Sequence, residues 1–156
     1  MKKFKLYLDT SVLNFALTND PSLTVHKTAT LNLLEQIKQE KFDCYISELV
    51  IAEINRAPKE KAELLHSLVS KLNLKALPID DQTKELADKY VDEKLFPVKY
   101  SDDALHIAIA SVNNLDVVVS WNFQHMVKLK TKIGVVAVNN LLGYKPIEVV
   151  SPEEVI

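Results

Sequence analysis

Three acidic residues stand where a chain of alternating strands and helices would bring side chains together. Asp9 directly follows the short apolar run Phe4–Leu8, so it would leave a buried strand at its carboxyl end. Glu53 and Asp103 each lie near the start of a later apolar segment with helical spacing. In open α/β sheets, ligands bind in the crevice outside the carboxyl ends of the strands. Carboxylate oxygens gathered at that edge would suit a hard divalent cation.

Asp9 and Glu53 also have structural alternatives. An acid after a strand often caps the following helix, although Ser11 is also placed to do so and would then leave Asp9 free. For Asp9 alone, capping and function are both open. Glu53 lies between Ala52 and Ile54 in a segment that is apolar nearly all round. Because a buried carboxylate is costly unless it is paired or bound to a metal, the sequence favours a functional role for Glu53.

The pair Asp102 and Asp103 follows Ser101, which is predicted to cap a helix. The helix dipole would stabilise either acid in the first turn. Helical spacing places Asp103 and His106 on one face, but it does not choose between the two acids. A histidine on a buried helix is more often a hydrogen-bonded core residue than a metal ligand, so we expect His106 to be structural.

A polar loop follows the β-branched run Val117–Val119. Asn122 in this loop would leave the sheet at the same edge as Asp9, where it offers either a neutral oxygen ligand or a helix cap; both alternatives are open. Trp121 would stack on a base or, more commonly, anchor the core. A short basic run follows, at Lys128, Lys130 and Lys132. Such a run is usually solvated, but here it is well placed to meet phosphates.

The elements that must position these residues alternate along the chain. Apolar runs predict strands at Phe4–Leu8, Phe42–Ile46, Lys75–Pro78, Val117–Val119 and Gly134–Val138. Helical spacing and caps predict helices at Ser11–Leu17, Val25–Glu40, Glu48–Arg56, Lys59–Leu72 and Asp102–Asn113, and one that begins at Asp80 or Asp81 and ends at Glu93. This alternation predicts an α/β fold with a parallel sheet covered on both sides. Residues 147–156 are expected to form an extended tail of one domain spanning 1–156.

Composition narrows the function classes. With 47% hydrophobic and 26% charged residues the chain is ordinary globular protein, and its net charge of −2 gives no basic footprint for nucleic acid. A metal and a local lysine rim can still attract phosphates. Only Gly134 and Gly143 are present, which excludes glycine-rich nucleotide loops. The single Cys44 and the lack of a long apolar run predict a cytoplasmic protein with no membrane span.

Four segments together resemble the PIN-domain family, most closely the VapC-like toxin ribonucleases of toxin–antitoxin pairs. They are Leu8–Leu13 (LDTSVL), Ser47–Ile54 (SELVIAEI), Asp103–Ala108 (DALHIA) and Val117–Asn122 (VVVSWN), in the order of the family. The resemblance implies a PIN-like three-layer α/β/α sandwich with a central, mainly parallel sheet. It also implies cleavage of single-stranded RNA with Mg²⁺ or Mn²⁺.

The resemblance assigns Asp9, Glu53 and Asp103 to a metal-binding, catalytic acidic cluster. The family commonly has a fourth acid after the fourth strand, and here that catalytic position is Asn122, which removes one negative charge. The resemblance further implies a cognate antitoxin and a homodimer.

Two rival functions follow from the same residues. A phosphatase of the haloacid dehalogenase type needs a second Asp two residues after the first, where this chain has Ser11. A catalytically degraded PIN-like protein would act as a protein-binding module, although retention of the acidic cluster argues against lost activity.

Overall fold

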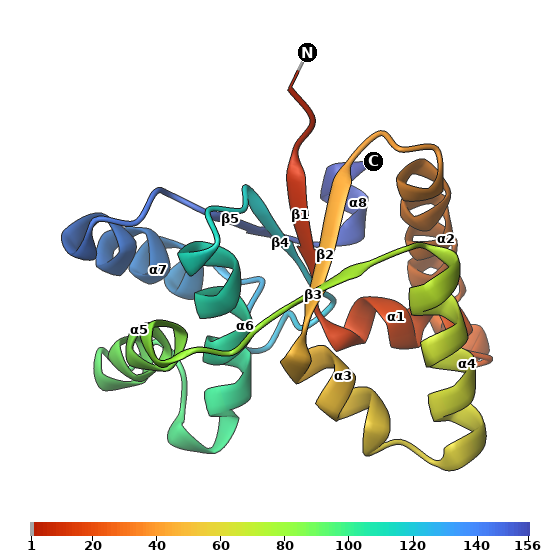
Figure 1. Cartoon of the computed structure of the whole chain (residues 1–156), viewed down its shortest axis with the longest axis horizontal. Helices are drawn as coiled ribbons and strands as arrows, with labels where there is room; N and C mark the ends of the chain where they lie inside the picture. The colour runs from red at the N-terminus through yellow and green to blue at the C-terminus, as the bar shows by residue number, and fades with distance from the viewer. Residues whose placement is uncertain (1) are drawn as a thin grey trace.

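A five-stranded, all-parallel sheet forms the centre of the structure, a computed structural model that describes residues 2–156 (Figure 1). The strands are β1 (Lys5–Leu8), β2 (Asp43–Ser47), β3 (Lys75–Leu77), β4 (Val117–Val119) and β5 (Glu148–Val150). Their order in the sheet is β3-β2-β1-β4-β5, so β1 is central. The predicted α/β fold with a parallel sheet is confirmed.

Helices cover both faces of this sheet. They are α1 (Thr10–Leu17), α2 (Thr24–Lys38), α3 (Glu48–Asn55), α4 (Lys59–Lys71), α5 (Asp81–Asp92), α6 (Ser101–Val112), α7 (Leu129–Leu142) and α8 (Pro152–Val155), with short 3₁₀ turns η1 (Pro21–Leu23) and η2 (Val98–Tyr100). Figure 1 shows α1 to α4 on one side of the strands and α5 to α7 on the other. The short α8 packs against α2. The layers are those of the predicted sandwich.

The register of β1 and β4 brings two polar residues to one edge of the sheet. Leu8 is paired with Val119, and the next residues, Asp9 and Ser120, both leave the sheet there. The Asp9 backbone N–H still donates to Val119 O at 3.2 Å, which extends the ladder by one bond. The carboxyl end of the central strand therefore presents a carboxylate beside a hydroxyl.

Helix α6 is the most buried helix of the fold. Seven of its residues are buried: Ala104, His106, Ile107, Ala108, Ile109, Ala110 and Ser111. It lies between the sheet and α5, and the small alanine side chains let the neighbouring backbones approach closely. A polar residue in such a helix must find a partner inside the protein, which determines the environment of His106.

Two predictions near the carboxyl end need correction. Gly134–Val138, predicted as a strand, lies inside α7, where Val135 and Val138 are buried three residues apart, as on one face of a helix. Gly134 is explained by packing, because a Cβ there would lie 2.2 Å from Leu95 Cδ2. The predicted extended tail, residues 147–156, is extended over β5, which adds a strand at the edge of the sheet, but its last residues form the short helix α8.

The predicted cap at Ser101 is also wrong. Ser101 is the first residue of α6, and Tyr100 occupies the N-cap position without a capping side chain. The predicted cap at Ser47 is correct, because its Oγ accepts from Val50 N at 3.2 Å. Within residues 2–156, no helix is long and apolar enough to cross a membrane.

Candidate active site

The predicted site residues line one pocket at the carboxyl edge of the sheet. This pocket has a volume of about 350 Å³ and is lined by Asp9, Thr10, Ser11, Asn14, Glu53, Arg56, Asp103, His106 and Asn122. Asp9 follows the end of β1, Glu53 comes from α3, Asp103 from α6 and Asn122 from the loop after β4. The topology thus brings together side chains up to 113 positions apart, from position 9 to position 122.

Asp9 caps α1 and is locked in place by two serine hydroxyls. Its Oδ1 accepts from Val12 N at 3.3 Å and from Ser11 Oγ, and its Oδ2 accepts from Ser120 Oγ. The alternative in which Ser11 caps the helix is wrong, because the Ser11 hydroxyl binds the capping carboxylate. Capping leaves Oδ2 with a single protein partner among the described residues, so Oδ2 can still accept a further ligand.

Both serines also tie the acid to the loop after β4. Ser11 Oγ accepts from Trp121 N, and Ser120 Oγ accepts from Asn122 N, each at 2.9 Å. The side chain of Asp9 is only 4% exposed. Its burial raises the pKa of Asp9, although the charge of His106 and the serine hydrogen bonds work against that rise. Asp9 is therefore a buried carboxylate with no basic side chain in direct contact among the described residues.

Glu53 and His106 form the second part of the site. Glu53 Oε1 lies 2.6 Å from His106 Nε2 and accepts from Thr10 Oγ1 at 2.8 Å. His106 Nδ1 lies 2.6 Å from the Tyr7 hydroxyl, which is itself 2.7 Å from Ser47 Oγ. His106 is thus the hydrogen-bonded core residue that the sequence predicted, and through Glu53 it also lines the pocket.

The charges of this pair stabilise each other. Burial alone would raise the pKa of Glu53, but the hydrogen bond and charge of His106 outweigh it, so the pKa is lowered. Burial alone would lower the pKa of His106, but the hydrogen bond and charge of Glu53 outweigh it, so that pKa is raised. Both shifts favour a carboxylate beside an imidazolium.

The two neighbouring acids of α6 point to different surroundings. Asp103 lines the pocket, whereas Asp102 forms an exposed ion pair with Arg56, with 3.7 Å between Asp102 Oδ2 and Arg56 Nη1. Burial raises the pKa of Asp103, and the nearby charge of Asp9 raises it further, against the charges of His106 and His125 and a hydrogen bond from Asn122. The structure therefore distinguishes Asp103, which lines the pocket, from Asp102, which does not, whereas helical spacing alone could not.

Asn122 holds the loop after β4 and lines the pocket together with Asp103. Its Oδ1 accepts from His125 N at 3.0 Å. The residues that follow form a turn, and α7 begins only at Leu129, so Asn122 caps a turn and not a helix. Its use as a neutral oxygen ligand stays a prediction.

Arg56 and Ser120 lie at the site and were not predicted. Arg56 lies one helical turn after Glu53, and its charge contributes to the lowered pKa of that acid. This spacing is visible in the sequence. Ser120 follows β4 just as Asp9 follows β1, so its position at a strand end was a second usable signal.

The donor chemistry of the pocket suits a hard divalent cation. Asp9 and Asp103 are carboxylates whose pKa values are raised by burial, in spite of the compensating charge of His106. Oxygen donors of this kind are those that Mg²⁺ and Mn²⁺ prefer. As the side chains lie, no three or more His, Cys, Asp or Glu residues between positions 2 and 156 are gathered closely enough to hold one ion.

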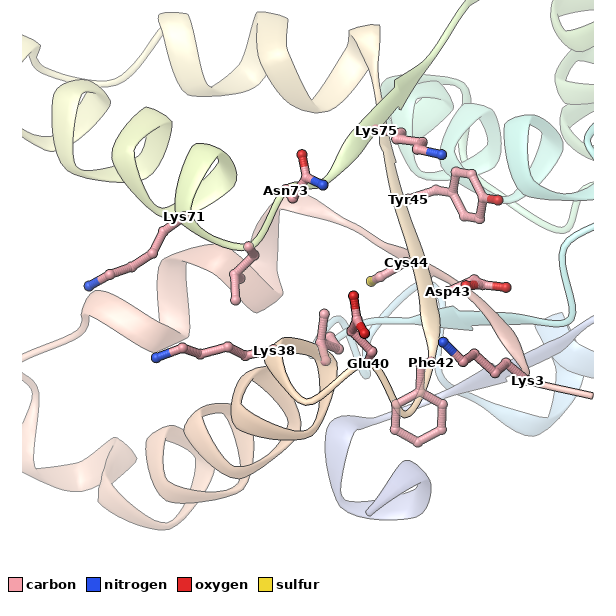
Figure 2. A pocket seen from close by; sticks show the side chains of 12 residues that line it. Lys3, Lys38, Glu40, Phe42, Asp43, Cys44, Tyr45, Lys71, Asn73 and Lys75 are labelled. Atoms are coloured by element: carbon pink, nitrogen blue, oxygen red, sulfur yellow. The ribbon is translucent and has the colours of Figure 1, made fainter. Parts of the chain in front are cut away.

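A second hollow, of about 320 Å³, lies at the opposite, amino end of the strands (Figure 2). Lys38 and Lys71 line it, and they are the last residues of α2 and α4, where the helix dipole favours a cation. Figure 2 shows both side chains extending away from Cys44. Burial raises the pKa of the Cys44 thiol, so it stays neutral and is a poor nucleophile. We assign no chemistry to this hollow.

Similar folds occur in solved structures of VapBC complexes. A chain of VapBC2 from Rickettsia felis, solved with a DNA fragment from its promoter, matches with a TM-score of 0.60 and 15% identity over 95% of this chain and 98% of that chain. A chain of VapBC-5 from Mycobacterium tuberculosis, from the VapBC family of toxin–antitoxin systems, matches with a TM-score of 0.50 and 14% identity over 94% and 98%. At such identities the likeness shows the fold alone.

The remaining comparisons concern the sequence. No curated protein matches the chain at a significant level. The family model described as the PIN domain matches residues 6–123, a stretch that contains Asp9, Glu53, Asp103 and Asn122. The sheet order and the acidic pocket agree with that match. The chain therefore belongs to the PIN-domain family.

Proposed function

We propose that this protein is a metal-dependent endoribonuclease that cleaves single-stranded RNA, and that it is the toxin of a toxin–antitoxin pair. The observation that carries the proposal is the convergence of Asp9, Glu53 and Asp103 on one pocket at the carboxyl edge of a parallel sheet. PIN-domain proteins are typically nucleases, which supports phosphodiester hydrolysis over other uses of an acidic pocket.

Asp9 and Asp103 are the residues that would hold the cation. Both carboxylates line the pocket, burial raises the pKa of each, and a cation there would compensate the negative charge that burial disfavours. When bound, Mg²⁺ or Mn²⁺ would supply positive charge that stabilises a phosphoryl oxygen and lowers the pKa of water. The serine hydroxyls on Asp9 keep its carboxylate from rotating away.

Glu53 would orient the attacking water. Its Oε1 is engaged by His106 and Thr10, which fixes the plane of the carboxylate and leaves Oε2 for a water molecule. The lowered pKa keeps Glu53 ionised, so it can accept a hydrogen bond from that water. Arg56 lines the same pocket and attracts the phosphate of the substrate.

Partners are proposed on the same basis. The similar solved chains come from VapBC complexes, one of them described as a toxin–antitoxin system, which supports a protein antitoxin for this chain. We also propose a homodimer.

Two lysines would contact the RNA beside the pocket. Lys128 and Lys130 line a hollow together with His125, a residue of the same loop as Asn122. There they would bind phosphates of the RNA.

Cleavage of a mixed single-stranded RNA pool tests the proposal. Purified wild type and Asp9→Asn are each assayed with Mg²⁺, with Mn²⁺ and with EDTA. We expect metal-dependent cleavage by wild type that falls by at least ~10²-fold in the variant. Equal metal-dependent cleavage by both proteins, with a contaminating nuclease excluded, would end the assignment of Asp9. No cleavage together with no Mn²⁺ binding would favour the rival function, a protein-binding module.

A further inference from the structure

The loop after β4 presents one aromatic side chain to solvent beside the acidic pocket. Phe123 is 49% exposed, whereas Trp121, Met126 and Val127 of the same loop are buried. Phe123 directly follows Asn122, which lines the pocket. A large apolar ring at this place gains from any flat partner that covers it.

The turn that carries this ring is held by hydrogen bonds. Asn122 O accepts from Met126 N at 3.0 Å and from Val127 N at 2.9 Å, and Asn122 Oδ1 accepts from His125 N at 3.0 Å. Phe123 N donates to Trp121 O at 3.0 Å. Because the backbone on both sides is fixed, little ordering remains to be done when a ligand covers the ring.

Trp121 supports the ring of Phe123 and is not itself available to a ligand. It is 5% exposed, and its Nε1 donates to Thr30 Oγ1 at 2.8 Å. It stacks on Phe15, with ring centroids 5.4 Å apart. Phe123 touches Trp121 and His26 by tilted edge contacts, at 5.9 and 6.5 Å. Among the described residues, no ring is stacked parallel to Phe123.

We propose that Phe123 is a stacking platform for one unpaired base of the RNA whose phosphate enters the acidic pocket. This inference rests on the function proposed above. An unpaired base exposes a flat face, and aromatic side chains bind such faces with little regard to sequence. The position next to Asn122 favours the base adjoining a bound phosphate over an unrelated protein partner. Stacking here would select single strands, because a base inside a duplex cannot cover the ring.

Trp121 provides a direct readout of this contact. It is the only tryptophan in the sequence, and its ring lies 5.9 Å from that of Phe123. We would titrate a single-stranded oligoribonucleotide into Asp9→Asn protein with Mg²⁺, so that cleavage does not deplete the ligand, and follow Trp121 fluorescence. The expected result is a saturable change. Adding Phe123→Leu should weaken binding roughly 5- to 100-fold, whereas Phe123→Tyr should stay within about 2-fold.

Phe4→Leu is the matched control, because Phe4 is 62% exposed but precedes β1, at the end of the strand away from the pocket. It should leave the affinity unchanged. An oligomer of abasic residues keeps the phosphates but offers nothing to stack. This abasic oligomer should therefore bind Asp9→Asn protein that keeps Phe123 as weakly as it binds Asp9→Asn protein that also carries Phe123→Leu. Equal affinities of these two proteins for the ordinary RNA would overturn the platform.

The two proposals fail in different ways. RNA binding that depends on Phe123, without metal-dependent cleavage by wild type, would keep the platform and reject the nuclease. Metal-dependent cleavage, with RNA affinity unchanged in Phe123→Leu, would keep the nuclease and reject the platform. In that second case the exposed ring would be left for a protein partner.

Discussion

His106 Nε2 lies 2.6 Å from Glu53 Oε1, which makes a buried histidine the anchor of a carboxylate at the pocket. The other ring nitrogen is held by Tyr7, so the imidazole has no freedom to turn. The side chain that selects the orientation of Glu53 therefore comes from the core of α6. Removing it should affect catalysis through position, not through direct contact with substrate.

We expect His106→Asn to lower kcat by about 10²-fold with little change in KM, because a displaced Glu53 no longer aligns the water. Leaving Tyr7 and Glu53 without their partner should also cost about 1–3 kcal/mol of unfolding free energy. Steady-state cleavage rates and urea unfolding measure the two effects. His66→Asn is the control, because His66 makes an exposed bond to Asn55 and neither residue lines the pocket. Unchanged kcat in His106→Asn would remove the positioning role.

The Glu53–His106 pair should stabilise the folded protein only within a window of pH. The folded pKa of His106 is raised, so its contribution is full below the unfolded value of about 6.5 and is lost as pH rises through the folded value. The folded pKa of Glu53 is lowered, so its contribution is full above about 4.3 and is lost as pH falls through the folded value. The difference in Tm between wild type and His106→Asn, measured in EDTA from pH 3 to 9, should therefore peak near pH 5–6. A flat difference would mean that the pair is neutral.

Asp9→Asn should stabilise the metal-free protein at neutral pH. The raised pKa of Asp9 means that the folded state resists its ionisation, so wild-type stability falls as pH rises through that pKa. Asparagine carries no charge, its Oδ1 can still cap α1, and its amide can donate to Ser120 Oγ. We expect a gain of a few degrees in Tm at pH 7–8 in EDTA, shrinking toward pH 4. Saturating Mn²⁺ should raise the Tm of wild type only. A variant less stable at every pH would contradict this.

Asp103 and Asp102 offer a test with neighbouring residues. Asp103→Asn should lower cleavage by at least ~10²-fold and weaken Mn²⁺ binding, because Asp103 lines the pocket. Asp102→Asn removes only an exposed pair with Arg56, worth up to about 1 kcal/mol, and should change cleavage by less than about 5-fold. Cleavage assays and Mn²⁺ calorimetry on both variants decide the assignment. Loss of activity in Asp102→Asn with Asp103→Asn active would reverse it.

The sequence predicts which acids lie at the pocket, but not the hydrogen bonds that hold their side chains in place. Asp9 and Val117–Val119 were informative because parallel strands end at one edge, so positions after them must converge. The bonds of Ser120 to Asp9 and of His106 to Glu53 depend on side-chain orientation and on register across more than 50 residues, from position 53 to 106, which periodicity does not encode.

The error at α7 has a similar cause. The run Gly134–Val138 is short, β-branched and apolar, and such runs do not distinguish a strand from a buried helix segment. Gly143, with φ of +85° just after α7, is the left-handed residue that commonly ends a helix, and this signal favoured a helix over a strand. The close packing of Gly134 against Leu95, which a Cβ would prevent, is a tertiary contact that the local sequence does not reveal.

Asn122→Asp tests the missing fourth acid. Aspartate can still accept from His125 N, but it adds a negative charge to the pocket that Asp103 lines, and this charge would raise the pKa of Asp103 further. The metal-free protein should therefore lose a few degrees of Tm at pH 7, with the loss shrinking as pH falls. Added carboxylate charge should tighten Mn²⁺ binding, by about 10-fold if the gain is 1.4 kcal/mol. Calorimetric titration and unfolding in EDTA measure the two effects. The control is Asn140→Asp, because Asn140 is exposed on α7 away from the pocket lining. Identical Mn²⁺ affinity in Asn122→Asp and wild type would place the cation beyond the reach of residue 122.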